Sequence, residues 1–317
     1  MKKNGELWIV PLCLRLKGAG NIKMKMTSKK QRTLFAASIC VLSCLCVSIM
    51  GVFSKLVSHE ISAFTVLLSL CIVIFLGTSV QVLKQGISTL RTNRLGLHCV
   101  RGIVGVTAYA FLFMSLKTTP LVDSMLLNNT APIWVPFIAF LWLKVRMRKE
   151  IWLTVGVGFL GVIAILKPDS GIFLTGSFFA LLSGVFGAIS FLAVARLKST
   201  ESTACILFYF SLIGIITMLP LGFHIPSPRD FWLLLGVGLI GFLGSALLAY
   251  SFEHGKASTL APLIYTTVVF SGIFDWLIWH HIPDFVAFLG MILVIGGSIL
   301  SIHFEQRYQK KLENANH

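Results

Sequence analysis

The chain has 317 residues, of which 56% are hydrophobic and only 12% are charged. Soluble domains carry roughly 25% charged residues because their surfaces face water. Half of that charge cannot cover a globule of this length, and the apolar runs between the charges are about 20 residues long, enough to cross a bilayer. The composition excludes a soluble domain and predicts an all-α membrane protein, since lipid demands a backbone that satisfies its own hydrogen bonds.

The chain begins with a polar, basic stretch, residues 1–33, which holds nine of the 27 lysines and arginines. Most of the others lie in short loops, which is the pattern of a topology signal rather than of a nucleic-acid-binding face. We therefore expect a cytoplasmic N-terminal tail and no nucleic-acid partner. Residues 1–23 are absent from the working protein if synthesis starts at Met24 or Met26.

Ten apolar runs follow, each bounded by charged or turn residues. They fall at about 34–57, 61–83, 97–117, 121–143, 150–167, 174–196, 203–222, 230–251, 258–279 and 283–304. Ten transmembrane helices place both termini on one side of the membrane, with residues 305–317 as a C-terminal tail. That side holds 22 lysines and arginines against four on the other, so we expect both termini in the cytoplasm.

A shift of the chain against itself by 136 residues reveals an internal repeat. Five glycines coincide, where chance gives about one coincidence. Glycines 51, 86, 102, 105 and 161 fall on glycines 187, 222, 238, 241 and 297. The repeat divides the chain into two units of five spans, residues 34–167 and 174–304. Because five is odd, the units enter the membrane in opposite senses, and such inverted repeats are typical of transporters with a site near the bilayer midplane.

Four stretches carry a family resemblance. They are "VRGIVGVTAYAFLFMSLKTTP" at 100–120, "NNTAPIWVPFIAFLW" at 128–142, "GFLGVIAILKP" at 158–168 and "ASTLAPLIYTTVVFSGIFDWLIWHHIPD" at 257–284. In their order and spacing they resemble the EamA family of the drug/metabolite transporter superfamily. The resemblance covers about 34–304 and implies ten transmembrane helices as two inverted five-helix repeats, with cytoplasmic termini. It also implies a central cavity lined mostly by helices 1, 3, 4, 6, 8 and 9.

This sequence departs from the family pattern at the ends of helices 4 and 9. Family members often close helices 4 and 9 with a glutamate, whereas Val145 and His281 stand at those places here. This argues against a mechanism that uses that acid as a proton carrier. His281 and its neighbour His280 are expected at the outer interface, where a pH-sensing role and no special role are both open.

Two adjacent amides, Asn128 and Asn129, lie in the fourth span about 10–12 Å below its outer end. An amide facing lipid would leave hydrogen bonds unmade at a cost of several kcal/mol, so we expect both to face other helices or water. Pro132 and Pro136 each free a carbonyl one turn earlier, which neighbours or a cavity must satisfy. Trp134 is placed either to stack on a flat substrate or to pack between helices.

The shift of 136 residues places Asn129 on Tyr265 in the ninth span, beside Thr266. The fourth span enters from outside and the ninth from inside, so the two polar clusters approach the midplane from opposite sides. These residues either line a substrate cavity or bond helix to helix.

Charged residues inside the spans are candidate functional groups because burying them is costly. Arg101, near the cytoplasmic end of the third span, either holds an anionic group of the substrate or extends to the interface. Lys55, Lys117 and Asp275 lie at comparable depths near the outer end. They form either an outer gate that breaks during transport or a static ion pair.

We expect neither a metal site nor a cofactor. Cys40, Cys44 and Cys46 lie in one apolar run at a spacing that does not converge on an ion. The stretches "GVGFLG" at 156–161 and "GVGLIG" at 236–241 match a dinucleotide fingerprint, yet both lie inside apolar spans, where small residues allow helices to approach closely.

These features predict a secondary transporter, not an enzyme, which moves a small organic metabolite across a bacterial inner membrane by alternating access. The resemblance includes S-adenosylmethionine uptake carriers of intracellular bacteria, riboflavin carriers, and exporters of amino acids, metallophores or drugs. Arg101 and Asp275 together would suit a zwitterion. Proton coupling, exchange coupling and a homodimer are all compatible with this interpretation. The competing classes are a lipid flippase and an integral membrane enzyme.

Overall fold

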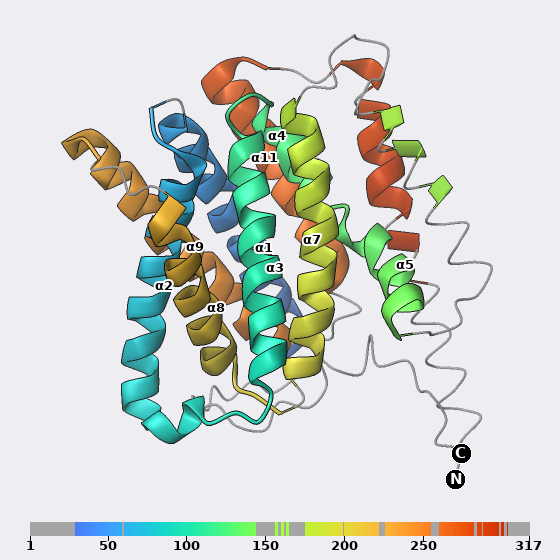
Figure 1. Ribbon diagram of the computed structural model, residues 1–317. Coiled ribbons are helices and arrows are strands. Elements are labelled where there is room, and N and C mark those ends of the chain that lie inside the picture. The colour runs from blue at the N-terminus through green and yellow to red at the C-terminus, as the bar shows by residue number, and fades with distance from the viewer. Residues whose placement is uncertain are drawn as a thin grey trace, which may run out of the picture.

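The computed structural model describes residues 29–58, 60–143, 175–198, 200–221, 226–254 and 260–281, together with parts of 156–164 and of 284–303. Within these residues every regular element is helical (Figure 1). The helices of the first half are α1 (Lys29–Val57), α2 (Ala63–Gln85), η2 (Ile87–Leu90), α3 (Leu95–Ser115), α4 (Leu121–Asn128) and α5 (Ala131–Leu143). Those of the second half are α7 (Thr175–Leu197), α8 (Thr203–Met218), η4 (Leu219–Leu221), α9 (Pro228–His254), η5 (Ala261–Tyr265) and α11 (Thr266–Trp279).

Six of the described helices are long and apolar enough to cross a membrane. They are Leu34–Val57, Ala63–Gln85, Leu95–Ser115, Thr175–Leu197, Thr203–Leu221 and Pro228–Phe252. Leu263–Trp279 and Phe288–Gly297 are shorter apolar helices. The expected spans at 150–167 and 283–304 lie largely outside the described residues, so the count of ten transmembrane helices stays a prediction.

The outward faces of the long helices carry large apolar side chains. Leu83 is 71% exposed, Trp232 69% and Ile216 63%. Exposed apolar surface on this scale is unfavourable in water and matches the hydrocarbon tails of a bilayer.

Two equivalent helices begin with the same signal. The Ser62 hydroxyl accepts a hydrogen bond from Phe64 N–H before α2, and the Ser202 hydroxyl accepts one from Cys205 N–H before α8, both at 3.2 Å. A serine in this position satisfies one of the free donors of the first helical turn. Both halves therefore start their second helix with a serine cap.

The principal contacts between the halves obey an exchange rule. The helix α1 packs on α9, and α3 packs on α7. The helix α2 also packs on α9, and the equivalent contact is that of α3 with α8. Likewise α1 packs on α11, and the equivalent contacts are those of α4 and α5 with α7. Exchange of α1 with α7, α2 with α8, α3 with α9, and α4 and α5 with α11 carries each contact into another one of the set. The described helices are thus arranged as two equivalent units.

Close contacts give the direction of each helix. Ser43 and Phe53 of α1 lie against Gly244 and Gly236 of α9, so these two helices are antiparallel. On the other side of the bundle, Arg94 at the start of α3 donates to the Arg196 carbonyl at the end of α7, so α3 and α7 are antiparallel. The two ribbons run side by side along the front of Figure 1.

The second helix of each half completes the pattern. Val73 and Gly77 of α2 meet Gly238 and Phe242 of α9, so α2 and α9 are parallel. His98 and Gly102 of α3 meet Tyr209 and Ile213 of α8, so α3 and α8 are parallel as well. With α8 antiparallel to α2, the helices α1, α2 and α3 each run opposite to their counterparts α7, α8 and α9. The described helices form inverted repeats.

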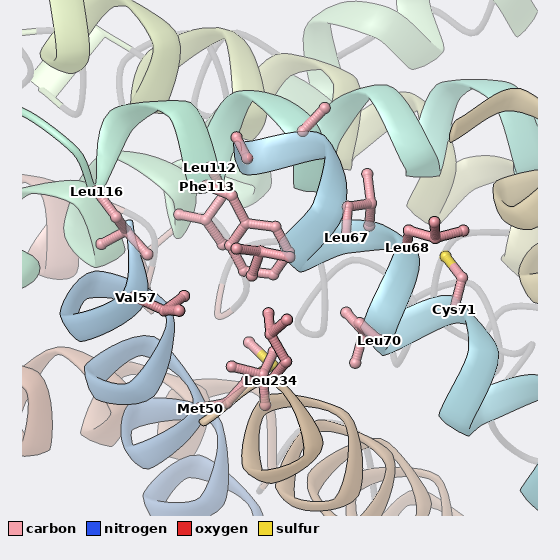
Figure 2. Packing of buried hydrophobic residues seen from close by; sticks show 14 of the residues in the cluster. Met50, Val57, Leu67, Leu68, Leu70, Cys71, Leu112, Phe113, Leu116 and Leu234 are labelled. Carbon is pink, nitrogen blue, oxygen red and sulfur yellow. The ribbon is translucent and has the colours of Figure 1, made fainter. Parts of the chain in front are cut away.

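A large apolar cluster joins helices of both halves, among them α1, α2, α3 and α9. Met50 of α1, Leu70 of α2, Phe113 of α3 and Leu234 of α9 each expose 5% of their surface or less, and Figure 2 shows them in one packed group. Glycines in "GVGLIG" allow this approach, because a Cβ at Gly241 would collide with Met50 and Leu70. The stretch therefore acts in helix packing, as expected.

The expectation of single helices at 121–143 and 258–279 is wrong. The first is divided into α4 and α5, which are joined by a turn at Asn129 and Thr130. The second consists of the 3₁₀ helix η5 followed by α11. Proline provides the physical cause, since Pro132 cannot donate to the Asn128 carbonyl and Pro262 fits only the first turn of a helix.

Candidate functional site

The two helix breaks occupy equivalent positions of the repeats. The turn between α4 and α5 lies at Asn129 and Thr130, and the junction of η5 and α11 lies at Tyr265 and Thr266. The shift of 136 residues places the first pair on the second. Paired discontinuous helices in inverted repeats mark the substrate site in many transporters, because their broken ends offer polar backbone groups at membrane depth.

Side chains at the first break bond two of its backbone carbonyls. The Asn129 side chain donates to the Met125 carbonyl at 2.8 Å, and the Thr130 hydroxyl donates to the Leu127 carbonyl at 2.6 Å. The side-chain oxygen Oδ1 of Asn128 accepts a hydrogen bond from the Ser183 hydroxyl of α7 at 2.6 Å. Asn128 therefore links helices, whereas Asn129 bonds within its own turn.

A serine hydroxyl of α1 bonds the second break, and a serine hydroxyl of α7 bonds the first. The Ser48 hydroxyl donates to the Thr267 carbonyl at 2.9 Å, and the Cys44 thiol lies 3.6 Å from the Leu263 carbonyl. The Thr266 hydroxyl also donates to the Leu263 carbonyl at 2.6 Å. Because α1 and α7 are equivalent helices, each break lies against the first helix of the other repeat.

The broken helices also meet each other. Val268, in the first turn of α11, packs in one cluster with Leu126 and Leu127 of α4. Tyr265 is 5% exposed. Trp134 is half-buried, and its indole N–H donates to the Thr130 hydroxyl at 3.2 Å. This bond orients the indole ring beside the first break.

Arg101 lies two turns into α3, between the helix start and the midplane. Its guanidinium rests over the ring of Phe210 of α8 at 4.5 Å and lies against Gly105. The Nε and Nη1 atoms are buried and have no hydrogen-bond partner among the described residues. Tyr109 of α3 packs on the same Phe210 ring, at 6.0 Å between centroids. A cation with unused donors therefore lies inside the bundle.

The helix α7 connects this cation to the first break. Ser190 of α7 lies beside Gly105, next to the guanidinium. Ser183, which bonds Asn128, is two turns away on the same face, about 10 Å along the helix. The polar groups of Arg101, Ser190, Ser183 and Asn128 therefore follow one line between α3, α4 and α7.

Three elements meet at Asp275, near the end of α11. Its carboxylate is fully buried and lies 3.3 Å from the Lys55 ammonium at the end of α1. The Val122 N–H in the first turn of α4 donates to the same carboxylate at 3.3 Å. The carboxylate thus compensates free donors of α4, where a negative charge is favourable. The Lys55 ammonium also lies 4.6 Å from the ring centre of Trp279.

Of the three residues expected at the outer end, Lys55 and Asp275 are brought together, whereas Lys117 is exposed. His281 takes the third place, with its Nδ1 atom 3.4 Å from the Asp275 carboxylate. The left-handed residue His280, with φ of 54°, reverses the chain after α11 and turns His281 back. We call Lys55, Asp275, His281 and the Val122 N–H the outer cluster.

Other contacts join the halves at the opposite end. The Thr92 hydroxyl donates to the Glu201 carboxylate at 2.7 Å, and the Tyr209 hydroxyl donates to the Leu90 carbonyl at 3.0 Å. The described bundle is therefore bridged between repeats at both ends. Sequence inspection missed Ser183 and Ser48, because a lone serine has no distinctive local pattern. It named His281 but not its contact with Asp275.

Each half of the chain, residues 34–167 and 174–302, matches the model of the EamA-like transporter family. The chain belongs to that family. It is a multi-pass membrane transporter of the drug/metabolite transporter superfamily type, not an enzyme, and it acts on a small molecule.

Curated relatives have transport in their names. The chain is 29% identical over 221 residues to the pseudopaline exporter CntI of Pseudomonas aeruginosa, which covers 68% of this chain and 77% of that protein. It is 24% identical over 242 residues to an S-adenosylmethionine uptake transporter of Rickettsia bellii, over 73% and 80% of the two chains. An uncharacterized transporter of Helicobacter pylori is 25% identical over 84% of this chain and 94% of its own.

The fold also matches a protein of known crystal structure. The TM-score is 0.58 at 15% identity, and the match covers 89% of this chain and 99% of that one. At this identity the likeness shows the fold alone.

Proposed function

We propose that this EamA-like transporter is a secondary carrier of a small metabolite with an anionic group, such as a carboxylate, and that Arg101 binds that group. The observation that carries the proposal is a guanidinium inside the bundle whose buried Nε and Nη1 atoms have no hydrogen-bond partner among the described residues. Leaving a charged donor unsatisfied inside a membrane bundle is expensive, and such groups face substrate paths by default. A planar guanidinium matches a carboxylate with two parallel hydrogen bonds.

The substrate is proposed to lie between Arg101 and the two helix breaks. Ser190 and Ser183 provide a polar face of α7 between them, and Trp134 and Tyr265 border the breaks. In this proposal Asn128, Asn129 and Thr266 change partners as the substrate enters. The names of the relatives make S-adenosylmethionine-like metabolites and metallophores two groups of compounds to test.

The proposed cycle alternates between the two bridged ends. The outer cluster opens while the contacts of Thr92, Tyr209 and their partners stay closed, and the reverse follows. This motion uses the inverted repeats as rigid units, which is how such carriers work. The proposed location is a bacterial inner membrane, and the count of basic residues favours both termini in the cytoplasm. The buried Asp275 already has the Lys55 ammonium and the Val122 N–H as partners, so the anionic group carries the proposal and a zwitterion is not required.

The test is transport by the purified protein in vesicles, in both directions, against a labelled panel of carboxylate-bearing and neutral metabolites. We expect Arg101→Gln to abolish transport of the carboxylate-bearing compound and Arg101→Lys to retain part of it, since lysine keeps the charge but loses the planar fork. Arg91→Gln is the matched control, because Arg91 is exposed in the loop before α3.

Normal carboxylate transport by Arg101→Gln would refute the role of Arg101. A labelled lipid is included in the same vesicles. Faster lipid movement between leaflets, with no metabolite transport, would replace the carrier by a flippase.

A further inference from the structure

At the inner end, the end at which α3 and α8 begin, three side chains with metal-binding atoms come together. They are His98 of α3, Glu201 before α8, and Cys205 in the first turn of α8. One nitrogen, one oxygen and the sulfur all lie within 4.8 Å of one another. We propose that His98, Glu201 and Cys205 form a binding site for a divalent transition-metal ion of the zinc class.

The types of donor atom select this class of ion. An imidazole nitrogen, a carboxylate oxygen and a thiolate are the three kinds of protein ligand that zinc uses, whereas magnesium and calcium prefer oxygen alone. Ligands bound at about 2.0–2.3 Å in a tetrahedron lie roughly 3.3–3.8 Å apart. The Cys205 sulfur and the Glu201 Oε2 atom are 3.6 Å apart, so these two already have that spacing.

His98 gives the independent evidence for a ligand. Its side chain is 1% exposed, yet neither ring nitrogen has a hydrogen-bond partner among the described residues. The ring of Tyr209 packs against the imidazole in a tilted arrangement, at 4.6 Å between centroids. A buried imidazole normally bonds through at least one nitrogen, so a missing partner such as a metal ion is the simplest explanation.

The surroundings hold the ligands in place as in known metal sites. Thr92 donates to the Glu201 Oε1 atom at 2.7 Å, which leaves Oε2 directed at Cys205. Ser202 caps α8 and fixes its first turn, from which Cys205 projects. A carboxylate oriented by an outer hydrogen bond is typical of metal sites, and the loss of such a bond lowers affinity about 10–100-fold.

The site also bridges the repeats. His98 belongs to the first repeat, and Glu201 and Cys205 belong to the second. A bound ion would therefore hold the inner end closed and slow transport. This consequence rests on the proposed alternating cycle, whereas metal binding itself does not.

The binding test uses the full chain, purified through a tag without histidine and freed of metal. Zn²⁺ is titrated in competition with a chromophoric chelator, and Co²⁺ is added in parallel to detect a thiolate-to-metal charge-transfer band. We expect one equivalent of tightly bound Zn²⁺ and a thiolate band in the wild type. Thr92→Val should weaken Zn²⁺ binding about 10–100-fold. Cys205→Ser should abolish the band and weaken Zn²⁺ binding more than Thr92→Val does.

The matched control is Cys99→Ser, because Cys99 is an exposed cysteine next to His98 in α3. It should bind like the wild type. Equal binding by Cys205→Ser and wild type, or no thiolate band in the wild type, would overturn the proposal. His98→Gln is a further variant. If it fails to fold, the Cys205→Ser result decides alone, since that change replaces one atom.

Transport assays distinguish metal binding from the effect of the bound metal on transport. We expect Zn²⁺ to inhibit the wild type and Cys99→Ser but not Cys205→Ser. Tight binding without inhibition would keep the metal site and refute its action between the repeats. Tight binding by a wild type that transports nothing in the panel would keep the metal site and count against the proposed carrier.

Discussion

Two charged residues inside the helix bundle, Asp275 and Arg101, have different surroundings. Asp275 has the Lys55 ammonium and the Val122 N–H as partners, with His281 Nδ1 3.4 Å away, so part of its lost hydration is replaced. The Nε and Nη1 atoms of Arg101 receive no such replacement among the described residues, apart from the ring of Phe210 next to the guanidinium. A stabilising role explains the first arrangement. The second fits the proposed role of Arg101, in which the substrate supplies the missing acceptors.

The position of Arg101 depends on Gly105. A Cβ at Gly105 would collide with the guanidinium Nη1 atom, which is the free end of a flexible side chain. We therefore expect Gly105→Ala to displace Arg101 at little cost to folding and to lower transport about tenfold, which is about 1.4 kcal/mol of substrate affinity. Transport and the unfolding temperature are measured together. Unchanged transport would show that the position of the guanidinium is unimportant.

The outer cluster allows a double-mutant test. Lys55→Met leaves Asp275 without its cation, and Asp275→Leu leaves Lys55 without its anion, so each is expected to destabilise the protein by about 3 kcal/mol. The double variant should be more stable than either single one, because no unpaired charge remains. Unfolding in detergent measures all four proteins, with Lys117→Gln as the exposed control. Additive losses would contradict a coupled ion pair.

Single residues show where sequence inspection reaches its limit. Polarity inside apolar runs is enough to single out Asn128, Arg101 and Asp275 from the sequence alone. Their partners Ser183 and His281 do not stand out in the same way. Ser183 is selected by the packing of α7 on α4, and His281 by the left-handed turn at His280, and neither is visible in local sequence.

At the scale of elements, length and hydropathy predicted most helices well. The run at 203–222 contains α8, and the run at 97–117 overlaps α3 almost completely. The breaks were missed because hydropathy averages over a window and stays high through Asn128 and Thr130. The prolines indicated freed carbonyls, yet whether the helix bends or ends there depends on the side chains that α7 offers.

The first break is testable through Pro132. An alanine at this position restores the N–H that could bond the Asn128 carbonyl, so α4 and α5 should join into one helix. We expect Pro132→Ala to reach the membrane at normal levels and to lose about tenfold in transport, equivalent to about 1.4 kcal/mol. Pro136→Ala is the control, since Pro136 lies inside α5, beyond the turn. Normal transport by Pro132→Ala would mean that the break is dispensable.

At the scale of the whole molecule, the inverted arrangement was predictable from an odd number of spans and a shift of 136 residues. The structure adds how the units meet. The pairs α1 with α9 and α3 with α7 hold the halves together along their length, whereas the outer cluster and the Thr92–Glu201 contact bridge them at the two ends. Such long-range pairing follows from packing of whole helices and not from any single motif.

The most direct test of alternating access is a pair of distances measured with spin labels. One pair replaces the exposed residues Lys117 and His280 at the outer end, and the other replaces Arg91 and Thr200 at the inner end, in a chain without its native cysteines. On addition of the transported metabolite, we predict that one distance lengthens while the other shortens. Distances that lengthen together, or that stay fixed while transport proceeds, would contradict the account.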